Sequence, residues 1–281
     1  YTMTDAVAYF PLTFFVTFFL SGYALWTSFC MDRKVDLSDL TAIMTSSVVI
    51  SGTIAMLLAE LEIYSWFRWA ALVTTVSVLL LIRNGSWRRF PIVRRASLRD
   101  SLLLCLAIII AAWEFLRPFE NVIGGEDTGV YFNTAVQIAL RGSVLVHVPV
   151  MASLNQTTFS SLYYPTSGGW GFYGSQHMGF YIDNPSKGIV VPQFFYLLPS
   201  LMAAFCSVHR PMMMLYFTPI LSLLSMMTVY VIVRRINGSL IAALSTALLG
   251  LNFAQIYFSR APFSDDLLQL LFLAAILAYA K

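Results

Sequence analysis

The chain has 281 residues, of which 58% are apolar and 11% are charged, whereas soluble domains have roughly 45–50% apolar and about 25% charged residues. This composition excludes an ordinary soluble domain, and long unbroken apolar runs exclude an outer-membrane barrel built from alternating strands. The net charge of +3 is not a signature of nucleic-acid binding. We therefore expect an all-α integral membrane protein that forms a multi-spanning helical bundle.

Six apolar stretches approach the roughly 20 residues that a helix needs to cross a membrane. They cover residues 6–29, 40–61, 66–82, 101–116, 212–233 and 240–258, and a seventh stretch begins near Leu267. The sequence therefore predicts about 6–7 transmembrane helices. It also suggests two parts: an N-terminal extension of three helices over residues 1–99, and a larger transmembrane domain over residues 100–281.

Basic residues gather in the short loops at one end of the predicted helices. Arginines crowd the loop 83–99, and alternation of the helices places Arg33, Lys34, Arg234 and Arg235 on the same side. Lysine and arginine mark the cytoplasmic side of a membrane protein. We therefore predict that the N-terminus and the long loop 117–211 lie outside, together with most of the acidic residues.

The long loop should contain short helices that lie at the membrane surface. Apolar residues over 128–140 recur at helical spacing, which predicts an amphipathic helix that ends at Gly142. The apolar segment 192–208 is long enough for a second short helix, interfacial or re-entrant, although Pro199 lies inside it. We expect both helices to be ordered.

The first candidate for chemistry is a pair of carboxylates between glycines, directly after the fourth predicted helix. Gly124 and Gly125 precede Glu126 and Asp127, and Gly129 follows them. Glycines allow a ligand to approach the backbone, and a carboxylate held at a membrane surface can accept a proton from a substrate hydroxyl. An inert aspartate cap beside a glycine turn would have the same local sequence.

The second candidate is the loop between the sixth and seventh predicted helices, on the same outer side. Arg260 lies close to the start of the seventh helix, where Ser264 or Asp265 could cap it and Asp266 follows. A helix N-terminus with an arginine nearby can bind phosphate. Simple capping is again the alternative.

No cofactor is clearly indicated. The three histidines show no spacing typical of metal ligands, although a divalent metal shared by carboxylates is compatible with the sequence. The cysteines are odd in number, scattered and expected to act as small apolar residues. The residues concerned are His147, His177, His209, Cys30, Cys105 and Cys206.

From about residue 101 onward, the chain resembles the N-terminal half of a GT-C superfamily membrane glycosyltransferase. The likeness is to the branch of protein O-mannosyltransferases and aminoarabinose transferases. It rests on the run 124–133 after a spanning helix, Gly179-Phe180-Tyr181, Pro192-Gln193-Phe194 and the run 255–260. It does not cover the first three predicted helices.

This resemblance implies an enzyme that takes a sugar from a polyprenyl-phosphate carrier and passes it to an acceptor on the outer face of a membrane, here a bacterial inner (plasma) membrane. It implies that Asp127 is the catalytic base, with Glu126 as the alternative. The residues implied in binding substrate or phosphate are Arg260, Asp265, Asp266, Tyr131 and Gln193. The chain departs from the family in being shorter and in having Asp-Asp where the second acidic position is often Glu.

Two other classes of protein stay open. One is an inactive or accessory structural subunit of a larger membrane complex. The other, a transporter, is disfavoured because charges within the predicted helices are nearly absent and no inverted repeat is evident. The expected partners are the lipid bilayer, a lipid-linked sugar and subunits of such a complex, and not nucleic acid.

Overall fold

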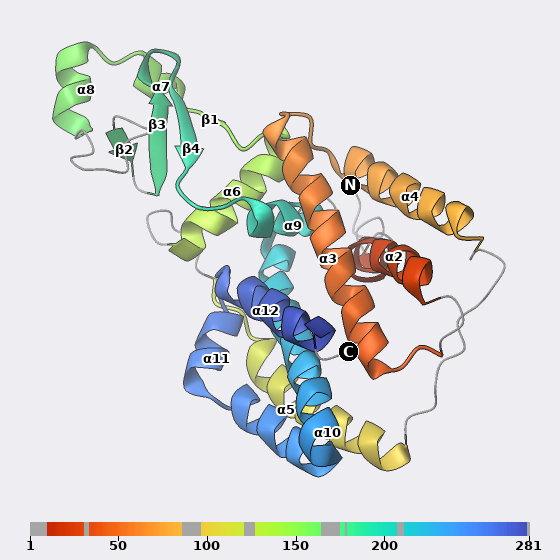
Figure 1. Ribbon diagram of the computed structural model, residues 1–281. Coiled ribbons are helices and arrows are strands. Elements are labelled where there is room, and N and C mark those ends of the chain that lie inside the picture. Colours follow the sequence, from red (N-terminus) through yellow and green to blue (C-terminus); the bar gives the residue numbers. More distant parts are fainter. Residues whose placement is uncertain are drawn as a thin grey trace.

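The computed structural model describes residues 10–30, 34–85, 97–120, 127–163, 175–177, 179–206 and 211–279. These residues are mostly helical (Figure 1). Four helices are long and apolar enough to cross a membrane: Phe10–Phe29, Leu37–Glu60, Trp66–Arg83 and Pro211–Gly250. The structure therefore agrees with a helical membrane protein. The four helices are fewer than the 6–7 spans that the sequence predicts.

The first three helices match the first three predicted spans. Phe10–Phe29 contains a π-helical turn, η1 (Val16–Leu20), followed by α2 (Ser21–Phe29), and α3 (Leu37–Glu60) and α4 (Trp66–Arg83) come next. A capping box begins α3, since Asp36 accepts from the amide of Asp39 at 2.9 Å and Asp39 accepts from the amide of Asp36 at 3.2 Å. Two backbone amides at the start of this helix are thus satisfied locally.

Hydroxyl and indole groups hold these three helices together. The Ser21 and Ser47 hydroxyls lie 3.0 Å apart, Ser51 donates to the Thr17 carbonyl at 3.2 Å, and the Trp69 indole donates to the Ser51 carbonyl at 3.0 Å. In an apolar surrounding a polar side chain needs such a partner. The contacts therefore set how the three helices pack.

The C-terminal helices form a second group around α10. It comprises α5 (Leu98–Phe115), η4 (Pro211–Tyr216), α10 (Phe217–Gly250), α11 (Phe253–Ser259) and α12 (Asp265–Tyr279). Gly238 has φ 81° and breaks α10 into two arms, and α10 packs against both α5 and α12. The arms match the fifth predicted span and most of the sixth.

Charge and length explain why α5 and α12 do not count among the four apolar helices. Arg99, Asp100 and Glu114 lie within the 18 residues of α5, and α12 has 15 residues. A helix needs about 20 mostly apolar residues to cross the hydrocarbon layer.

The long loop contains the two predicted helices and a small sheet that the sequence did not predict. α6 (Asp127–Arg141) ends at Gly142, which has φ 75°, and α9 (Leu197–Cys206) tolerates Pro199 in its first turn. The other elements are β1 (Val146–His147), α7 (Pro149–Ala152), α8 (Gln156–Leu162), β2 (Ser175–His177), β3 (Phe180–Asn184), η3 (Pro185–Lys187) and β4 (Ile189–Pro192). The strands pair antiparallel in the order β1-β4-β3-β2 and project from the helical body (Figure 1).

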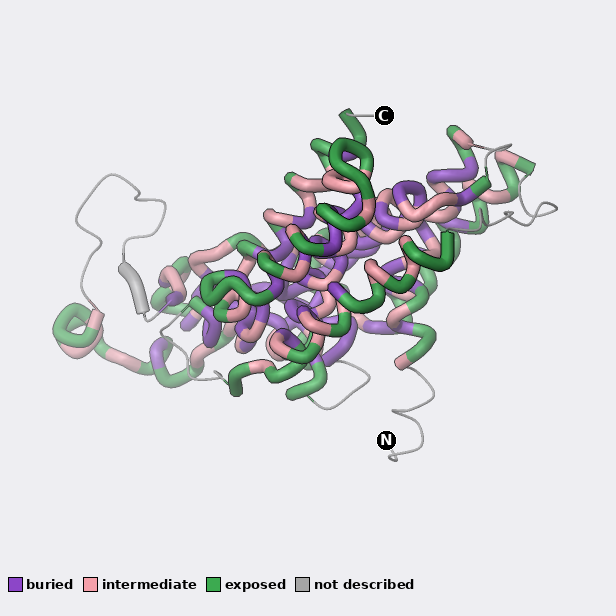
Figure 2. Tube along the Cα trace, turned by 90° about the horizontal axis from the view of Figure 1, so that it is seen from below, coloured by how far each residue is buried: buried purple, intermediate pink, exposed green. Residues whose placement is uncertain are grey.

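One apolar core joins both halves of the chain. It contains Phe18 from the first helix, Trp69 from α4, Ile138 from α6, Leu201 from α9 and Phe217 from α10. Buried residues run through the middle of the helical body, and many outward-facing helix surfaces are exposed (Figure 2). The core thus takes residues from both sides of the predicted boundary near residue 99.

Helix ends that alternation places on one side of the membrane are joined by polar contacts. At one end, Arg234 pairs with Asp100 at 2.6 Å and Arg235 donates to the Ser38 hydroxyl at 2.9 Å. At the other end, the Phe119 amide donates to the Arg260 carbonyl at 2.7 Å. Both sets of contacts join segments that are far apart in the sequence.

Candidate functional site

Asp127 is exposed at the first turn of α6. Tyr131 and Ile138, which follow Asp127 on the same face of the helix, are buried in the main core, as its amphipathic sequence requires. A helix N-terminus carries a partial positive charge that stabilises a nearby carboxylate. Glu126, the neighbouring candidate, lies outside the described residues.

Tyr131 joins three segments that are far apart in the sequence. Its hydroxyl donates to Ser264 at 3.0 Å, in the loop before α12, and its ring stacks on Phe194 at 5.2 Å, in the turn after β4. Burial, together with the negative charges of Asp127 and Asp265, raises the pKa of the Tyr131 hydroxyl, while the hydrogen bond with Ser264 acts the other way. The two acidic segments therefore lie around one tyrosine.

Gln193 lies in the same turn as Phe194. The backbone amide of Gln193 donates to the Gly179 carbonyl at 3.1 Å. Gly179 has φ 78°, and a Cβ atom there would lie 2.1 Å from a methyl group of Val130 in α6. Glycine is thus required both for the backbone conformation and for the close packing, which brings the turn after β4 against α6.

Arg260 is engaged by the end of α5. Its Nε donates to the Glu114 carbonyl at 2.7 Å, and its Nη2 forms an ion pair with the Glu114 carboxylate at 2.8 Å. The guanidinium also lies 5.8 Å from the ring centre of Phe119. Glu114, a charge near the C-terminal end of an apolar helix, is therefore neutralised by the residue that the sequence suggested for phosphate.

The two aspartates at the start of α12 have different surroundings. Asp265 is exposed, whereas Asp266 is 1% exposed and accepts from the Ser222 hydroxyl at 2.6 Å and from the Gln255 amide at 3.3 Å. Its Oδ2 atom is buried and has no hydrogen-bond partner among the described residues. Burial raises the pKa of Asp266 to about 7, with a smaller contribution from the charge of Asp265.

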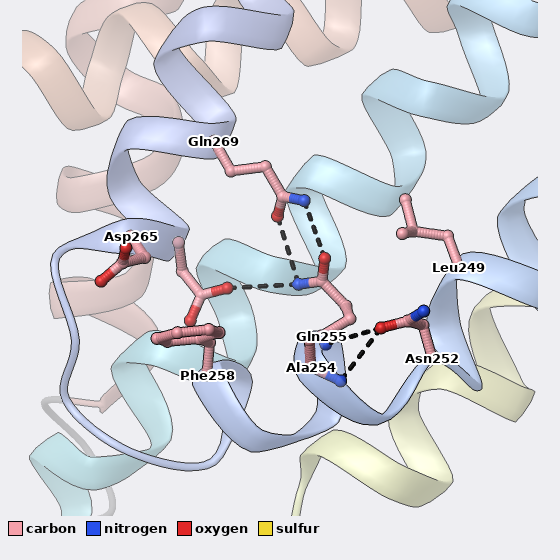
Figure 3. A pocket seen from close by; sticks show the side chains of 8 residues that line it. Leu249, Asn252, Ala254, Gln255, Phe258, Asp265 and Gln269 are labelled. Atoms are coloured by element: carbon pink, nitrogen blue, oxygen red, sulfur yellow. Dashed lines mark hydrogen bonds between the residues drawn. The ribbon is translucent and has the colours of Figure 1, made fainter.

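A cavity of about 350 Å³ lies between the end of α10, α11 and α12 (Figure 3). Gln255 and Gln269 pair with each other across it at 2.7 and 3.2 Å. The side-chain oxygen of Asn252 caps α11 by accepting from the backbone amides of Ala254 and Gln255 at 3.0 and 3.4 Å. The lining residues are Leu249, Asn252, Ala254, Gln255, Phe258, Asp265, Asp266 and Gln269.

The structure offers no preformed metal centre within its described ranges. No group of three or more His, Cys, Asp or Glu side chains there could hold a metal ion. The cysteines Cys30, Cys105 and Cys206 are all free thiols. His209 lies outside the described ranges.

Sequence reasoning missed several polar members of this region. Ser222 lies in an apolar run of α10 and Gln269 in an apolar run of α12, and neither was singled out. An isolated polar residue in an apolar helix is itself a signal, because it needs a polar partner or a cavity. Phe194 was noted only as part of the run with Gln193.

No protein-family model, curated protein or solved structure matches the chain.

Proposed function

We propose that the chain is a membrane glycosyltransferase that moves a sugar from a polyprenyl-phosphate carrier to an acceptor on the outer face of a bacterial inner membrane. The observation that carries the proposal is the hydrogen bond between Tyr131 and Ser264. It brings the first turn of α6, with Asp127, next to the loop that precedes Asp265. The proposal includes 6–7 spans, in which α5, each arm of α10 and α12 take part, and an outer N-terminus.

The proposed chemistry uses an exposed carboxylate as the base. Transfer requires that a proton leave the acceptor hydroxyl while the phosphate departs from the sugar. Asp127 is accessible to an acceptor from the outer surface. Tyr131, in α6, and Gln193, in the turn after β4, would position the substrates. Arg260 would contact the phosphate at the edge of its ion pair with Glu114.

The alternative is a structural subunit of a larger membrane complex. The ion pair between Arg260 and Glu114 favours it, because two donor groups of the arginine already serve a contact within the chain. A subunit of this kind would keep its fold and its partners after Asp127 is replaced.

The test is Asp127→Asn in the full-length protein, assayed in membranes for transfer from a polyprenyl-phosphate sugar. Asparagine keeps the size of the side chain but cannot accept the proton, and a general base contributes about 10²–10⁴-fold in rate. We expect transfer to fall by that factor with normal folding. Asparagine is as good a helix cap as aspartate, so a capping role alone predicts no loss.

Glu126→Gln is the matched control for the neighbouring carboxylate. Near-normal transfer by Asp127→Asn together with an inactive Glu126→Gln would move the base by one residue. Normal rates for both variants would refute the enzymatic role of this segment and favour the structural subunit.

A further inference from the structure

In the proposed arrangement of spans, the sixth span is made of two helices rather than one. The arm of α10 that follows Gly238 ends at Gly250, and at 1.5 Å per residue it is about 18 Å long. The hydrocarbon layer is about 30 Å thick. Asn252 then caps α11, which continues the span. The chain therefore passes from one helix to the next before it has crossed the hydrocarbon layer.

Contacts with α5 give the depth of this break independently. A Cβ atom on Gly250 would lie 2.9 Å from the Cβ atom of Ala111. Ala111 lies about one helical turn, or roughly 5 Å, before Phe115, where α5 ends. Arg260, directly after α11, binds Glu114 at the end of α5. The break thus lies about one turn below the end of α5, and α11 covers the remaining distance.

Within the part of the chain that the structure describes, this break is open to its surroundings. Leu251 and Phe253, on either side of Asn252, are 53% and 82% exposed. The last carbonyls of one helix and the first amides of the next lack partners within their helices. Irregular backbone at membrane depth is tolerated only where protein buries it or where it lines a water-filled cavity. The exposure of the break favours the second case.

The cavity between α10, α11 and α12 lies directly at the break (Figure 3). Leu249 and Asn252 line it at the break, Gln255 and Gln269 add two amide groups, and Asp265 lines it at the start of α12. Its volume of about 350 Å³ far exceeds the roughly 30 Å³ that one water molecule takes in the liquid. A lipid tail there would remove the carboxylate and the amides from water, which is costly.

We infer that this cavity is a water-filled recess through which the outer aqueous phase reaches the break at Asn252, inside the hydrocarbon layer. The recess meets the candidate site at Asp265, which lines the cavity and whose negative charge acts on Tyr131. It admits water and small polar solutes. The inference goes beyond sugar transfer, and it takes from the proposed function only the spans and their orientation.

Cysteine labelling in membranes tests the recess. A methanethiosulfonate reagent with a trimethylammonium group reacts with the thiolate, which forms in water and is disfavoured in apolar surroundings. Leu249 lines the cavity, whereas its neighbour Leu248 is outside the lining and 71% exposed. Leu248→Cys is therefore the matched control at the same depth. With the native cysteines replaced, we expect reagent added from outside to label Leu249→Cys at least tenfold faster than Leu248→Cys.

Ala254→Cys and Phe253→Cys form a second pair, on α11, if Leu249→Cys fails to fold. Ala254 lines the cavity, and Phe253 does not. Equally slow labelling of both members of a folded pair would show that the cavity excludes water and would overturn the inference. Equally fast labelling would place the break outside the hydrocarbon layer and would overturn it as well.

The recess and the proposed function can fail separately. Selective labelling of the cavity cysteine in a protein without transferase activity would retain the recess and refute the enzyme. Transfer that depends on Asp127, with no difference within either cysteine pair, would retain the enzyme and refute the recess. Selective labelling only after the cells are opened would contradict access from the outer side and, with it, the proposed orientation.

Discussion

Burial raises the pKa of Asp266, so its carboxyl group is partly protonated near neutral pH. Its pKa of about 7 arises from loss of solvent, and the hydrogen bonds from Ser222 and Gln255 offset part of the effect. It precedes the apolar run that begins at Leu267, so its proton can exchange near the helix end. Small pH changes should therefore alter its charge, which has a measurable consequence for stability.

The folded protein should lose stability as the pH rises from about 4 to 7. The pKa of Asp266 is higher in the folded chain than the ordinary value of 3.8, so its contribution is fully present below that value and is lost as the pH rises through about 7. A shift of this size corresponds to roughly 4 kcal/mol. Thermal unfolding of the wild type and of Asp266→Asn in detergent, across this pH range, checks the prediction.

The stability of Asp266→Asn should depend less on pH, because asparagine does not titrate. The difference between the two profiles cancels the titration of all other groups. Parallel profiles would show that Asp266 stays in one protonation state across the range.

Exchanging the charges of the ion pair between Glu114 and Arg260 separates the structural role of Arg260 from a role in binding. Arg260→Glu alone places two carboxylates together and should lower the melting temperature. Adding Glu114→Arg restores an ion pair and should recover most of the loss. If Arg260 also contacts the phosphate of the carrier, the double variant should regain stability while KM for the carrier stays raised.

Transfer kinetics and thermal unfolding of the same three proteins check this prediction. Recovery of both stability and KM would show that the pair is structural alone. Failure of the double variant to regain stability would contradict the pairing described for the end of α5.

At the scale of single elements, the junction between α6 and the α3–α4 turn depends on Gly142. The Tyr64 amide donates to the Gly142 carbonyl at 3.0 Å, and a Cβ atom on Gly142 would lie 2.6 Å from the Tyr64 carbonyl oxygen. Gly142→Ala therefore combines backbone strain of about 1–2 kcal/mol with a steric conflict of about 1–3 kcal/mol.

Gly85→Ala is the control for the backbone term. Gly85 has a similar φ of 64°, and no atom of the described residues lies within 4 Å of its Cβ position. Chemical unfolding should show a clearly larger loss of stability for Gly142→Ala than for Gly85→Ala. Equal losses would mean that the contact with Tyr64 contributes nothing.

The sequence predicted the elements whose signals are local. The helical spacing before Gly142 predicted α6, and long apolar runs predicted the first three helices and the arms of α10. The sheet was missed because its strands have two to five residues, too few for a clear alternation, and β1 pairs with the distant β4. The ion pair of Arg260 was missed because its partner, Glu114, lies 146 residues away.

At the scale of the whole molecule, the contacts at the helix ends lead to a prediction of topology. Single cysteines at Ser160 and at Gly85, both exposed, should react differently with a membrane-impermeant thiol reagent. The Ser160 position should be labelled in intact cells, whereas the Gly85 position should be labelled only after the cells are opened. The native cysteines are first replaced by alanine or serine, and this background protein is the control.

The reverse labelling pattern would place Asp127 and the loop before α12 on the cytoplasmic side. That result would refute transfer on the outer face. Labelling of both positions in intact cells would show that α5, the predicted span between them, does not cross the membrane.

The hydrogen bonds among the first three helices also bear on the order of assembly during synthesis. Ser21, Ser47, Ser51 and Trp69 all lie within the first 83 residues, so these contacts need nothing that the ribosome adds later. Interhelical bonds in membranes contribute about 0.6 kcal/mol each on average, enough to bias partners that are already held close by short connections. We expect the first three helices to assemble before the rest of the chain and to present the apolar surface against which α9 and α10 then pack.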